Sequence, residues 1–357
     1  MSNYIEFDDR AAFHPGYYIK EIVDESGLTQ EDFARRLGTT PKNLSVLLSG
    51  KQSLSIDIAG KLARMLGTTI TYWLNLQQTY DIKQAEFLSL KELEREKDAF
   101  KLIDYKYFRE HFNLPDLPRN IAGQIKSLRD FLLISSLSVL EERDLAISFR
   151  SYSDALGRSN IVNANAMVQV AINMALKIDA PRFNRKKFDQ AVAFALTQTK
   201  NHSGFLPIVQ EAFREAGVIL IVLPNLKNSG INGATKKLGQ KVLLMLNDRR
   251  HYADTFWFTL FHEIGHILHG DFGITLDGEA EDYADRYARE ALIPQDKYEA
   301  FTAQHKTFDE AIIRDFADSI DQDPGIVFGR LQKDGKIPYT QTDMSKRLRT
   351  TYTVRFS

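Results

Sequence analysis

Apolar residues recur at helical spacing along most of the chain, and near the N-terminus turn residues interrupt them at short intervals. Between residues 14 and 77, five segments each carry an apolar stripe, and the first four end on glycine. A glycine there closes a helix by taking the left-handed conformation. Thr29 and Thr40 stand in N-cap position before two of the segments, and Pro41 follows Thr40 at the first helical position. The pattern predicts a bundle of five short helices.

The hydrophobic period changes in the second half of the chain. Residues 82 to 112 and 120 to 215 keep a helical spacing, and the prolines of "NLPDLPRN" separate them. The runs "GVILIVLP" (217–224) and "KVLLMLN" (241–247) are short and rich in β-branched and aliphatic residues, which is typical of buried strands. The turn-rich segment between them has room for a third strand. We therefore expect a small sheet, followed by a helix.

Composition narrows the classes of site that the chain can carry. A length of 357 residues favours two or three domains, and the absence of cysteine excludes disulfides, thiolate nucleophiles and metal sites built on sulfur. Any metal must then be held by histidine and carboxylate. The first ten residues lack an apolar signal core, and no apolar run approaches the roughly 20 residues that span a bilayer, so we expect a cytoplasmic protein without membrane contact.

The distribution of charged residues indicates one local basic patch. The net charge of -1 gives no overall attraction to nucleic acid, but the stretch from Arg35 to Arg64 holds six basic residues and one acid, Asp57.

The segment "DTFWFTLFHEIGHILHG" (254–270) carries the clearest chemistry. It has the pattern of a helix capped by Asp254 and closed by Gly270, and it places His262, His266 and His269 on one stripe. Residues 262–266 form an H-E-x-x-H motif, in which two imidazoles one turn apart bind zinc and the intervening Glu263 acts as general base for peptide hydrolysis. The alternative is a set of core histidines bonded to backbone oxygens.

A catalytic zinc site needs a third protein ligand and an open position. The helical segment after the motif has Glu281 and Asp285 one turn apart, which suits Glu281 as the ligand and Asp285 as the partner of a histidine's second nitrogen. Glu279 and Asp277 are alternative ligands. His269 lies three residues from His266, which does not match the three-histidine class, so we expect it outside the ligand set or at the cleft edge.

Three motifs together resemble the ImmA/IrrE family of zinc metallopeptidases. They are "DTFWFTLFHEIGHILHG", "EDYADRYAREALIP" and "PGIVFGRLQKDGKIP", and the preceding "GINGATKKLGQKVLLMLNDRR" is similar to that family's strand region. The resemblance covers about residues 205 to 338. It implies that His262, His266 and Glu281 hold Zn²⁺ and that Glu263 is the catalytic base.

The N-terminal segments have the layout of a helix-turn-helix. Residues 30–37 form its first helix and residues 41–48 its recognition helix, with Leu44, Leu47 and Leu48 turned inward. A bundle used only for dimerisation is the alternative. The stretches "HPGYYIKEIVDESGLTQEDFARRLG" and "GTTITYWLNLQQTYD" resemble the Cro/C1-type domain of HigA-like antitoxins, which implies operator binding as a dimer. The expected DNA-binding residues are Gln30, Arg36, Thr40, Lys42, Asn43, Ser45 and Lys51.

Together these patterns predict a mainly α protein. It comprises a helix-turn-helix domain (1–81), a helical connector (82–118), a helical middle region (119–205), an α+β zincin-like domain with a small sheet (206–338) and a basic tail (339–357). We expect a DNA-binding regulator of antitoxin-like or repressor-like architecture, whose peptidase domain cleaves a protein partner or itself. Two alternatives are a binding-only antitoxin with a structural or sensory metal site, and a peptidase that ignores DNA.

Overall fold

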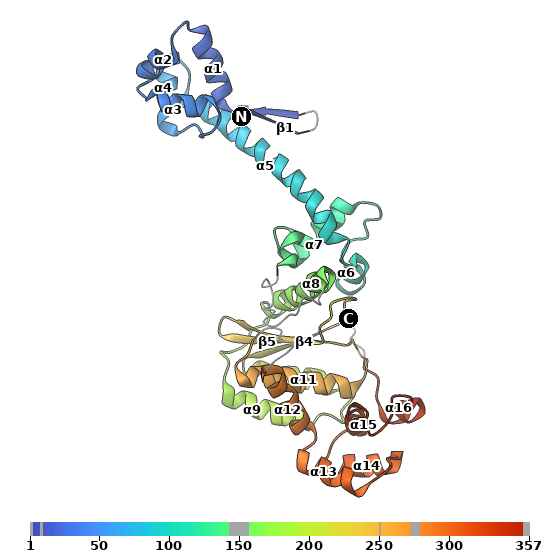
Figure 1. Ribbon diagram of the computed structural model, residues 1–357. Helices are drawn as coiled ribbons and strands as arrows, with labels where there is room; N and C mark the ends of the chain where they lie inside the picture. Colours follow the sequence, from blue (N-terminus) through green and yellow to red (C-terminus); the bar gives the residue numbers. More distant parts are fainter. Residues whose placement is uncertain (1–2, 8–9, 143–156, 250, 273–278, 353–357) are drawn as a thin grey trace. The chain divides into compact units, whose positions relative to one another are not determined.

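The computed structural model describes residues 3–7, 10–142, 157–249, 251–272 and 279–352 (Figure 1). The chain divides into two compact units, Met1–Arg95 and Glu96–Ser357, and each is described by itself. The mainly α class with a small sheet in the C-terminal region is confirmed. None of the described helices is both long and apolar enough to span a membrane.

The first unit contains the expected helical bundle. Its helices are α1 (Pro15–Glu25), α2 (Gln30–Leu37), α3 (Pro41–Leu48), α4 (Ile56–Leu66) and the start of α5 (Ile70–Phe100). Thr29 accepts a hydrogen bond from the Asp32 N–H and Thr40 accepts one from the Asn43 N–H, each over 3.1 Å. Local capping chemistry therefore sets the two helices of the helix-turn-helix. They pack on a core that includes Phe33, Leu44, Leu62 and Trp73.

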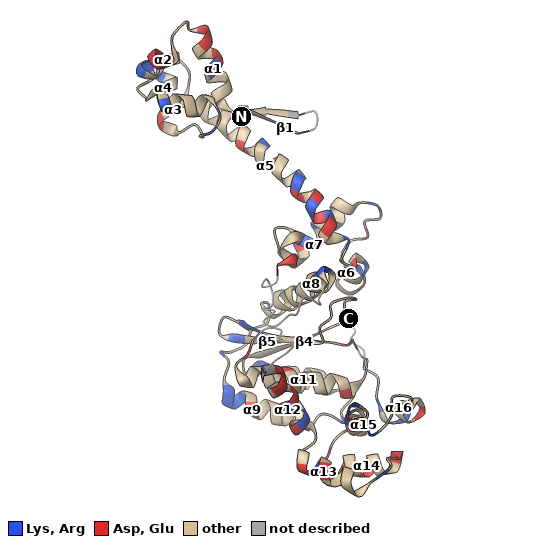
Figure 2. Cartoon of the chain, in the orientation of Figure 1, with Lys and Arg blue, Asp and Glu red and all other residues tan. Residues whose placement is uncertain are grey.

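Two features of this unit differ from the sequence pattern. The fifth helix is not short, because α5 runs for 31 residues without a glycine or proline to end it. Its C-terminal half carries alternating basic and acidic residues (Figure 2). In addition, β1 (Tyr4–Phe7) and β2 (Arg10–Phe13) form an antiparallel hairpin that the pattern of apolar residues did not indicate.

The second unit is built on a three-stranded sheet in the order β3-β5-β4. Strands β3 (Val218–Leu223) and β5 (Lys241–Asn247) are parallel, and β4 (Gly233–Leu238) pairs with β5 in antiparallel register at the edge. Both parallel strands are buried on both faces, which explains their continuous apolar runs. Helix α8 (Arg158–Ala175) covers one face and α11 (Ala253–His269) lies on the other (Figure 1).

The remaining helices surround this sheet and α11. In chain order they are α6 (Tyr105–Phe112), α7 (Ile121–Leu132), the 3₁₀ helix η1 (Leu137–Glu141), α9 (Arg185–Leu196), α10 (Phe205–Glu215), α12 (Glu279–Leu292), α13 (Gln295–Gln304), α14 (Glu310–Ser319), α15 (Pro324–Lys333) and α16 (Thr342–Leu348). The apolar core between the sheet and α11 includes Leu220, Leu244, Trp257 and Leu260. Helix α11 is thus held over most of its length by buried side chains.

Residues 349–352, which we call the clasp segment, fasten the start of α11. The N-cap of α11 is Tyr252, so the expectation that Asp254 caps this helix is wrong. Asp254 instead forms a buried, two-bond ion pair with Arg349, at 2.9 and 2.7 Å. The Ala253 N–H donates to the Thr350 carbonyl over 2.9 Å. The carboxylate of Asp254, which the sequence alone assigns to a local N-cap, therefore binds a residue that is distant in the sequence.

Candidate metal centre

Helix α11 presents the two histidines of the motif on one face. They are four residues apart, and the distance between their Nε2 atoms is 3.1 Å. His266 is buried and His262 is partly buried. Because one turn of helix separates them, both rings turn the same nitrogen toward a single point.

Close packing of α12 on α11 brings the acidic residue of the next helix over this point. Gly265 lies directly beneath α12, where a Cβ atom at residue 265 would stand 2.9 Å from Cα of Ala284. Ala284 and Ala288 are fully buried in this contact, whereas Tyr283 and Tyr287 are only partly buried. The small residues allow the two helix backbones to approach, and Glu281 then faces the histidines.

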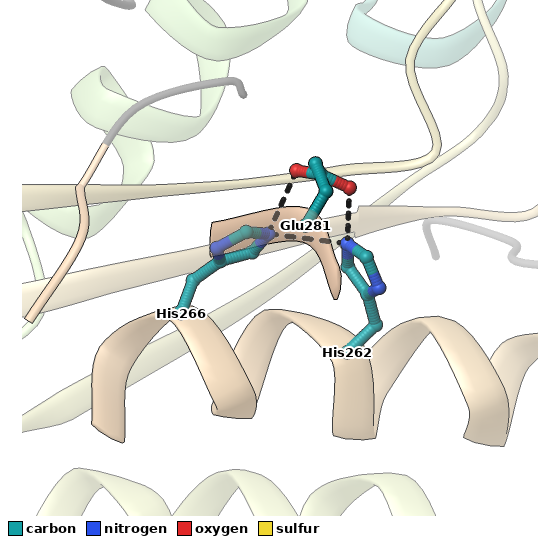
Figure 3. A group of neighbouring side chains, drawn as sticks. All are labelled: His262, His266 and Glu281. Carbon is teal, nitrogen blue, oxygen red and sulfur yellow. Dashed lines mark hydrogen bonds and ion pairs between the residues drawn. The ribbon is translucent and has the colours of Figure 1, made fainter. Parts of the chain in front are cut away.

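The three predicted ligands converge in the structure (Figure 3). Oε2 of Glu281 lies 3.2 Å from Nε2 of His262, and Oε1 lies 3.1 Å from Nε2 of His266. Oε1 is buried, with Nε2 of His266 as its neighbour.

These distances fit a zinc ion. With ligand bonds of about 2.0–2.1 Å, neighbouring ligand atoms around a tetrahedral zinc ion stand roughly 3.3 Å apart. The two Nε2 atoms are 3.1 Å apart, and each has one of the two Glu281 oxygens as a neighbour, at 3.2 Å for His262 and 3.1 Å for His266. The donor set, two nitrogens and one carboxylate, is also that of a catalytic zinc site with three protein ligands.

Asp285, one turn after Glu281, orients His262. Its Oδ1 lies 2.9 Å from Nδ1 of His262, so a proton on Nδ1 is donated to this carboxylate and Nε2 faces Glu281. Burial alone lowers the pKa of His262, but the hydrogen bonds to Asp285 and Glu281 outweigh burial and raise the pKa to about 10. Burial raises the pKa of Glu281, and the two histidines bring it down to about 2. Without a metal, His262 is thus protonated, and its positive charge pairs with the carboxylates of Glu281 and Asp285.

Glu263 lies on α11 and faces β4, the edge strand of the sheet. It is 6% exposed, and burial raises its pKa to about 7. Gly233, the first residue of β4, contacts it so closely that a Cβ atom there would stand 2.5 Å from Oε1 of Glu263. The strand edge and the carboxylate are therefore neighbours.

His269, which was also considered as a ligand, stands apart from the three converging residues. His269 is half exposed, with Nδ1 2.6 Å from Oδ2 of Asp271 and its ring 4.6 Å from that of Tyr283. It contacts none of the three converging residues among the described interactions. Asp277 lies outside the described residues, as does the side chain of Glu279.

The expected DNA-contacting residues lie on the surface of the first unit. All seven are exposed: Gln30, Arg36, Thr40, Lys42, Asn43, Ser45 and Lys51. The hydroxyl of Thr40 is engaged in capping α3. Among the other basic residues of this patch, Arg35 pairs with Glu31 at 2.5 Å and Lys61 with Asp57 at 2.7 Å. The exposed surface of α3 is thus polar, with Leu44, Leu47 and Leu48 buried beneath it.

The motif pattern did not indicate the glycines that shape the centre. Gly233 and Gly265 permit the approach of β4 and α12, and neither has a positive φ that would mark it as a turn residue. The only signal in the sequence is a glycine inside a helix and another at a strand start, where glycine often allows close backbone contact.

The fold and the two sites define a helix-turn-helix protein that carries an H-E-x-x-H domain. A family model described as helix-turn-helix matches residues 19–73, and one described as an IrrE N-terminal-like domain, a peptidase family, matches residues 219–322. The uncharacterized HTH-type transcriptional regulator YddM of Escherichia coli K12 is 38% identical over 72 residues, which are 20% of this chain and 77% of that protein. The chain therefore belongs to the helix-turn-helix transcriptional regulators and carries an IrrE N-terminal-like domain.

Two further similarities concern comparably short stretches. Virulence-associated protein I of Dichelobacter nodosus is 30% identical over 80 residues, which are 22% of this chain and 74% of that protein. The solved structure of an addiction module antidote protein of the HigA family from Coxiella burnetii is 34% identical, covering 23% of this chain and 91% of that one, with a TM-score of 0.22.

Proposed function

We propose that this transcriptional regulator binds an operator through α3 and uses its IrrE-like domain as a zinc-dependent peptidase on a protein partner or on itself. The observation that carries the peptidase half is the convergence of His262, His266 and Glu281, with Glu263 buried beside them. Zinc is the metal that this donor set favours, and when bound it supplies Lewis-acid chemistry toward water and the peptide carbonyl.

The residues around the centre have complementary roles in this proposal. His262, His266 and Glu281 hold the metal, and Asp285 keeps Nε2 of His262 directed at it. Glu263 takes a proton from the attacking water and passes it to the leaving amide nitrogen, for which a pKa near neutrality is suited. The edge strand β4 offers its unpaired side to an extended substrate segment by strand addition.

The metal and the hydrolysis are tested separately. Elemental mass spectrometry on untagged protein, purified without chelator, should give about one zinc per chain, and His262→Ala should lose it. Glu263→Gln should keep the zinc but abolish cleavage of partner proteins encoded beside this chain. Zinc retained with no cleavage by either the parent or the variant would favour the alternative in which the metal site is structural or sensory.

The DNA-binding half rests on the exposed polar face of α3. We assign base contacts to Asn43, with Lys42 and Ser45 beside it, and phosphate contacts to Gln30, Arg36 and Lys51, while Thr40 caps the recognition helix. Operator binding as a homodimer follows from the spacing that helix-turn-helix proteins need between half-sites.

A gel shift on the chain's own promoter tests this assignment. Asn43→Ala should cost about 1–3 kcal/mol and relax sequence preference, whereas Lys51→Ala should weaken binding to all sequences and reduce its salt dependence. Lys20→Ala, an exposed lysine on α1, is the matched control and should leave binding unchanged. Equal binding by all three variants would overturn this assignment of base and phosphate contacts.

A further inference from the structure

A second cavity lies beyond the metal centre along the same pair of helices. Its volume is about 390 Å³, and its walls come from the first half of α11, the end of α12 and α15. Phe258, one turn before His262 on α11, is part of the wall, and the centroids of the two rings are 6.4 Å apart. The metal ligands themselves do not line this cavity.

The inner wall of the cavity is apolar. Leu292, Ile293 and Ile326 are each no more than 5% exposed, and with Phe258 they form a continuous aliphatic and aromatic surface. Tyr339 stands at the rim and is 70% exposed. Small-molecule sites are concave, mostly apolar and about 300–1,000 Å³ in volume, with a few polar groups for orientation. The cavity meets this description.

Its charged groups are four basic side chains and two carboxylates, those of Asp254, which pairs with Arg349, and Asp334, whose Oδ2 lies 3.8 Å from Nε of Arg330. Four basic side chains line it, and two of them are already engaged. The Arg349 guanidinium pairs with Asp254, and the Arg330 guanidinium donates to the carbonyls of Arg289 and Ile293. Nε of Arg330 is buried without a hydrogen-bond partner among the described residues.

The other two basic side chains are those of Arg289 and Lys333. Within the described part of the chain, neither Arg289 nor Lys333 is in an ion pair or donates a side-chain hydrogen bond. Arg289 contributes to the lowered pKa of Asp285, one turn earlier on α12, but that carboxylate is bonded to His262. Arg289 is half-buried and Lys333 is exposed. A half-buried guanidinium beside an apolar wall favours an anion, because a charged partner is most effective where water is partly excluded.

We propose that this cavity is a binding site for a small amphipathic anion, a monocarboxylate with an apolar body. Its carboxylate pairs with Arg289 and Lys333, and its apolar part packs against Phe258, Leu292 and Ile326. A peptide main chain is a poorer fit, because no residue of β3, β4 or β5 lines the cavity. The site does not depend on the proposed peptidase activity.

Isothermal titration calorimetry of the full, zinc-loaded chain tests the site with sodium octanoate and with octan-1-ol as the uncharged analogue. We expect saturable binding of one octanoate per chain and binding of octan-1-ol that is weaker by about tenfold or more. Arg289→Gln and Lys333→Gln should each weaken octanoate binding by about tenfold. Lys336→Gln is the matched control, because Lys336 is exposed nearby but does not line the cavity.

Two further variants test the rim of the cavity and its independence from the metal centre. Tyr339→Ala changes an exposed rim residue and should weaken binding several-fold without loss of fold. His266→Ala should leave octanoate binding intact. Absence of octanoate binding, equal binding of both probes, or binding that is lost in His266→Ala but kept in Arg289→Gln would overturn the proposal, and the last result would place the carboxylate on the metal instead.

Discussion

Nδ1 of His262 and Oδ1 of Asp285 lie 2.9 Å apart, on two helices that pack through Gly265 and Ala284. This contact leaves Nε2 of His262 directed at Glu281. The orientation of one ligand therefore depends on a carboxylate that is not itself close to the point where the ligands converge.

Removal of this carboxylate should weaken metal binding. Asp285→Ala should lower zinc affinity by about 10–100-fold, because the ring of His262 loses the acceptor that fixes its orientation. Competition against a chromophoric chelator measures this change. Asp285→Asn retains an acceptor and should recover part of the loss. Asp282→Ala, an exposed aspartate on the same helix, is the control. Equal affinities for Asp285→Ala and the parent would show that Asp285 has no orienting role.

Zinc binding should release a proton near neutral pH. The pKa of His262 is about 10 without metal, so this residue is protonated at pH 7.5 and must lose its proton to bind zinc. Affinity should therefore fall as the pH is lowered and become independent of pH above about 10. Calorimetric titrations in two buffers of different ionisation enthalpy count the protons. A release near zero at pH 7.5 contradicts the prediction.

Glu263 should destabilise the metal-free fold at neutral and alkaline pH. Burial raises its pKa from the ordinary value of 4.5 to about 7, so the unfolded chain ionises first as the pH increases. The destabilisation is small below pH 4.5, grows between 4.5 and 7 and is constant above. Glu263→Gln should thus raise the unfolding free energy by about 2 kcal/mol more at pH 8 than at pH 5.

Denaturant unfolding of the apo protein at the two pH values measures this difference. Glu215→Gln, at an exposed glutamate on α10, is the control variant. A Glu263→Gln variant that gains nothing between pH 5 and pH 8 would mean that the carboxylate is accommodated in its ionised form.

A methyl group at residue 265 should separate α12 from α11. Gly265→Ala places Cβ 2.9 Å from Cα of Ala284, which is backbone and cannot yield as a flexible side chain does. We expect a loss of about 1–3 kcal/mol in stability, together with weaker zinc binding as Glu281 moves away. Gly60→Ala in α4 is the control, since a Cβ there has its nearest neighbours at 3.8 Å. It should be neutral or stabilising.

Gly233→Ala should lower the proposed peptidase activity without loss of zinc. The new Cβ atom would stand 2.5 Å from Oε1 of Glu263, so the carboxylate must move while the three metal ligands, which lie on other elements, are unaffected. We expect zinc content to stay near that of the parent and turnover of any cleaved partner to fall by about 100-fold. Loss of zinc in this variant would instead indicate that β4 supports the ligands.

The features that were best predicted from the sequence depend on interactions between residues that are close together in the chain. Thr29, Thr40 and Gly38 mark helix ends through hydrogen bonds and backbone conformations within a few residues, and the structure confirms them. The helical spacing of the motif likewise predicted that His262 and His266 share a face, as they do.

Features that depend on distant partners could not be predicted in the same way. The preference for Glu281 over its neighbours rested on spacing and resemblance, whereas its position over the histidines results from the contact of Gly265 with Ala284. Asp254 looked like a cap because its partner, Arg349, is 95 residues away. The hairpin at residues 4–13 is too short for its alternation to stand out from chance.

The clasp segment also determines which of the two units is completed first during synthesis. Domains fold as the ribosome delivers them, from the N-terminal side onward. The first turn of α11 is tied by hydrogen bonds to Thr350 and by the ion pair of Asp254 with Arg349, and these partners are translated after every other element of the second unit. The nascent chain therefore carries a finished helix-turn-helix while the start of its H-E-x-x-H helix still lacks the clasp segment, so we expect the first unit to be complete before the second.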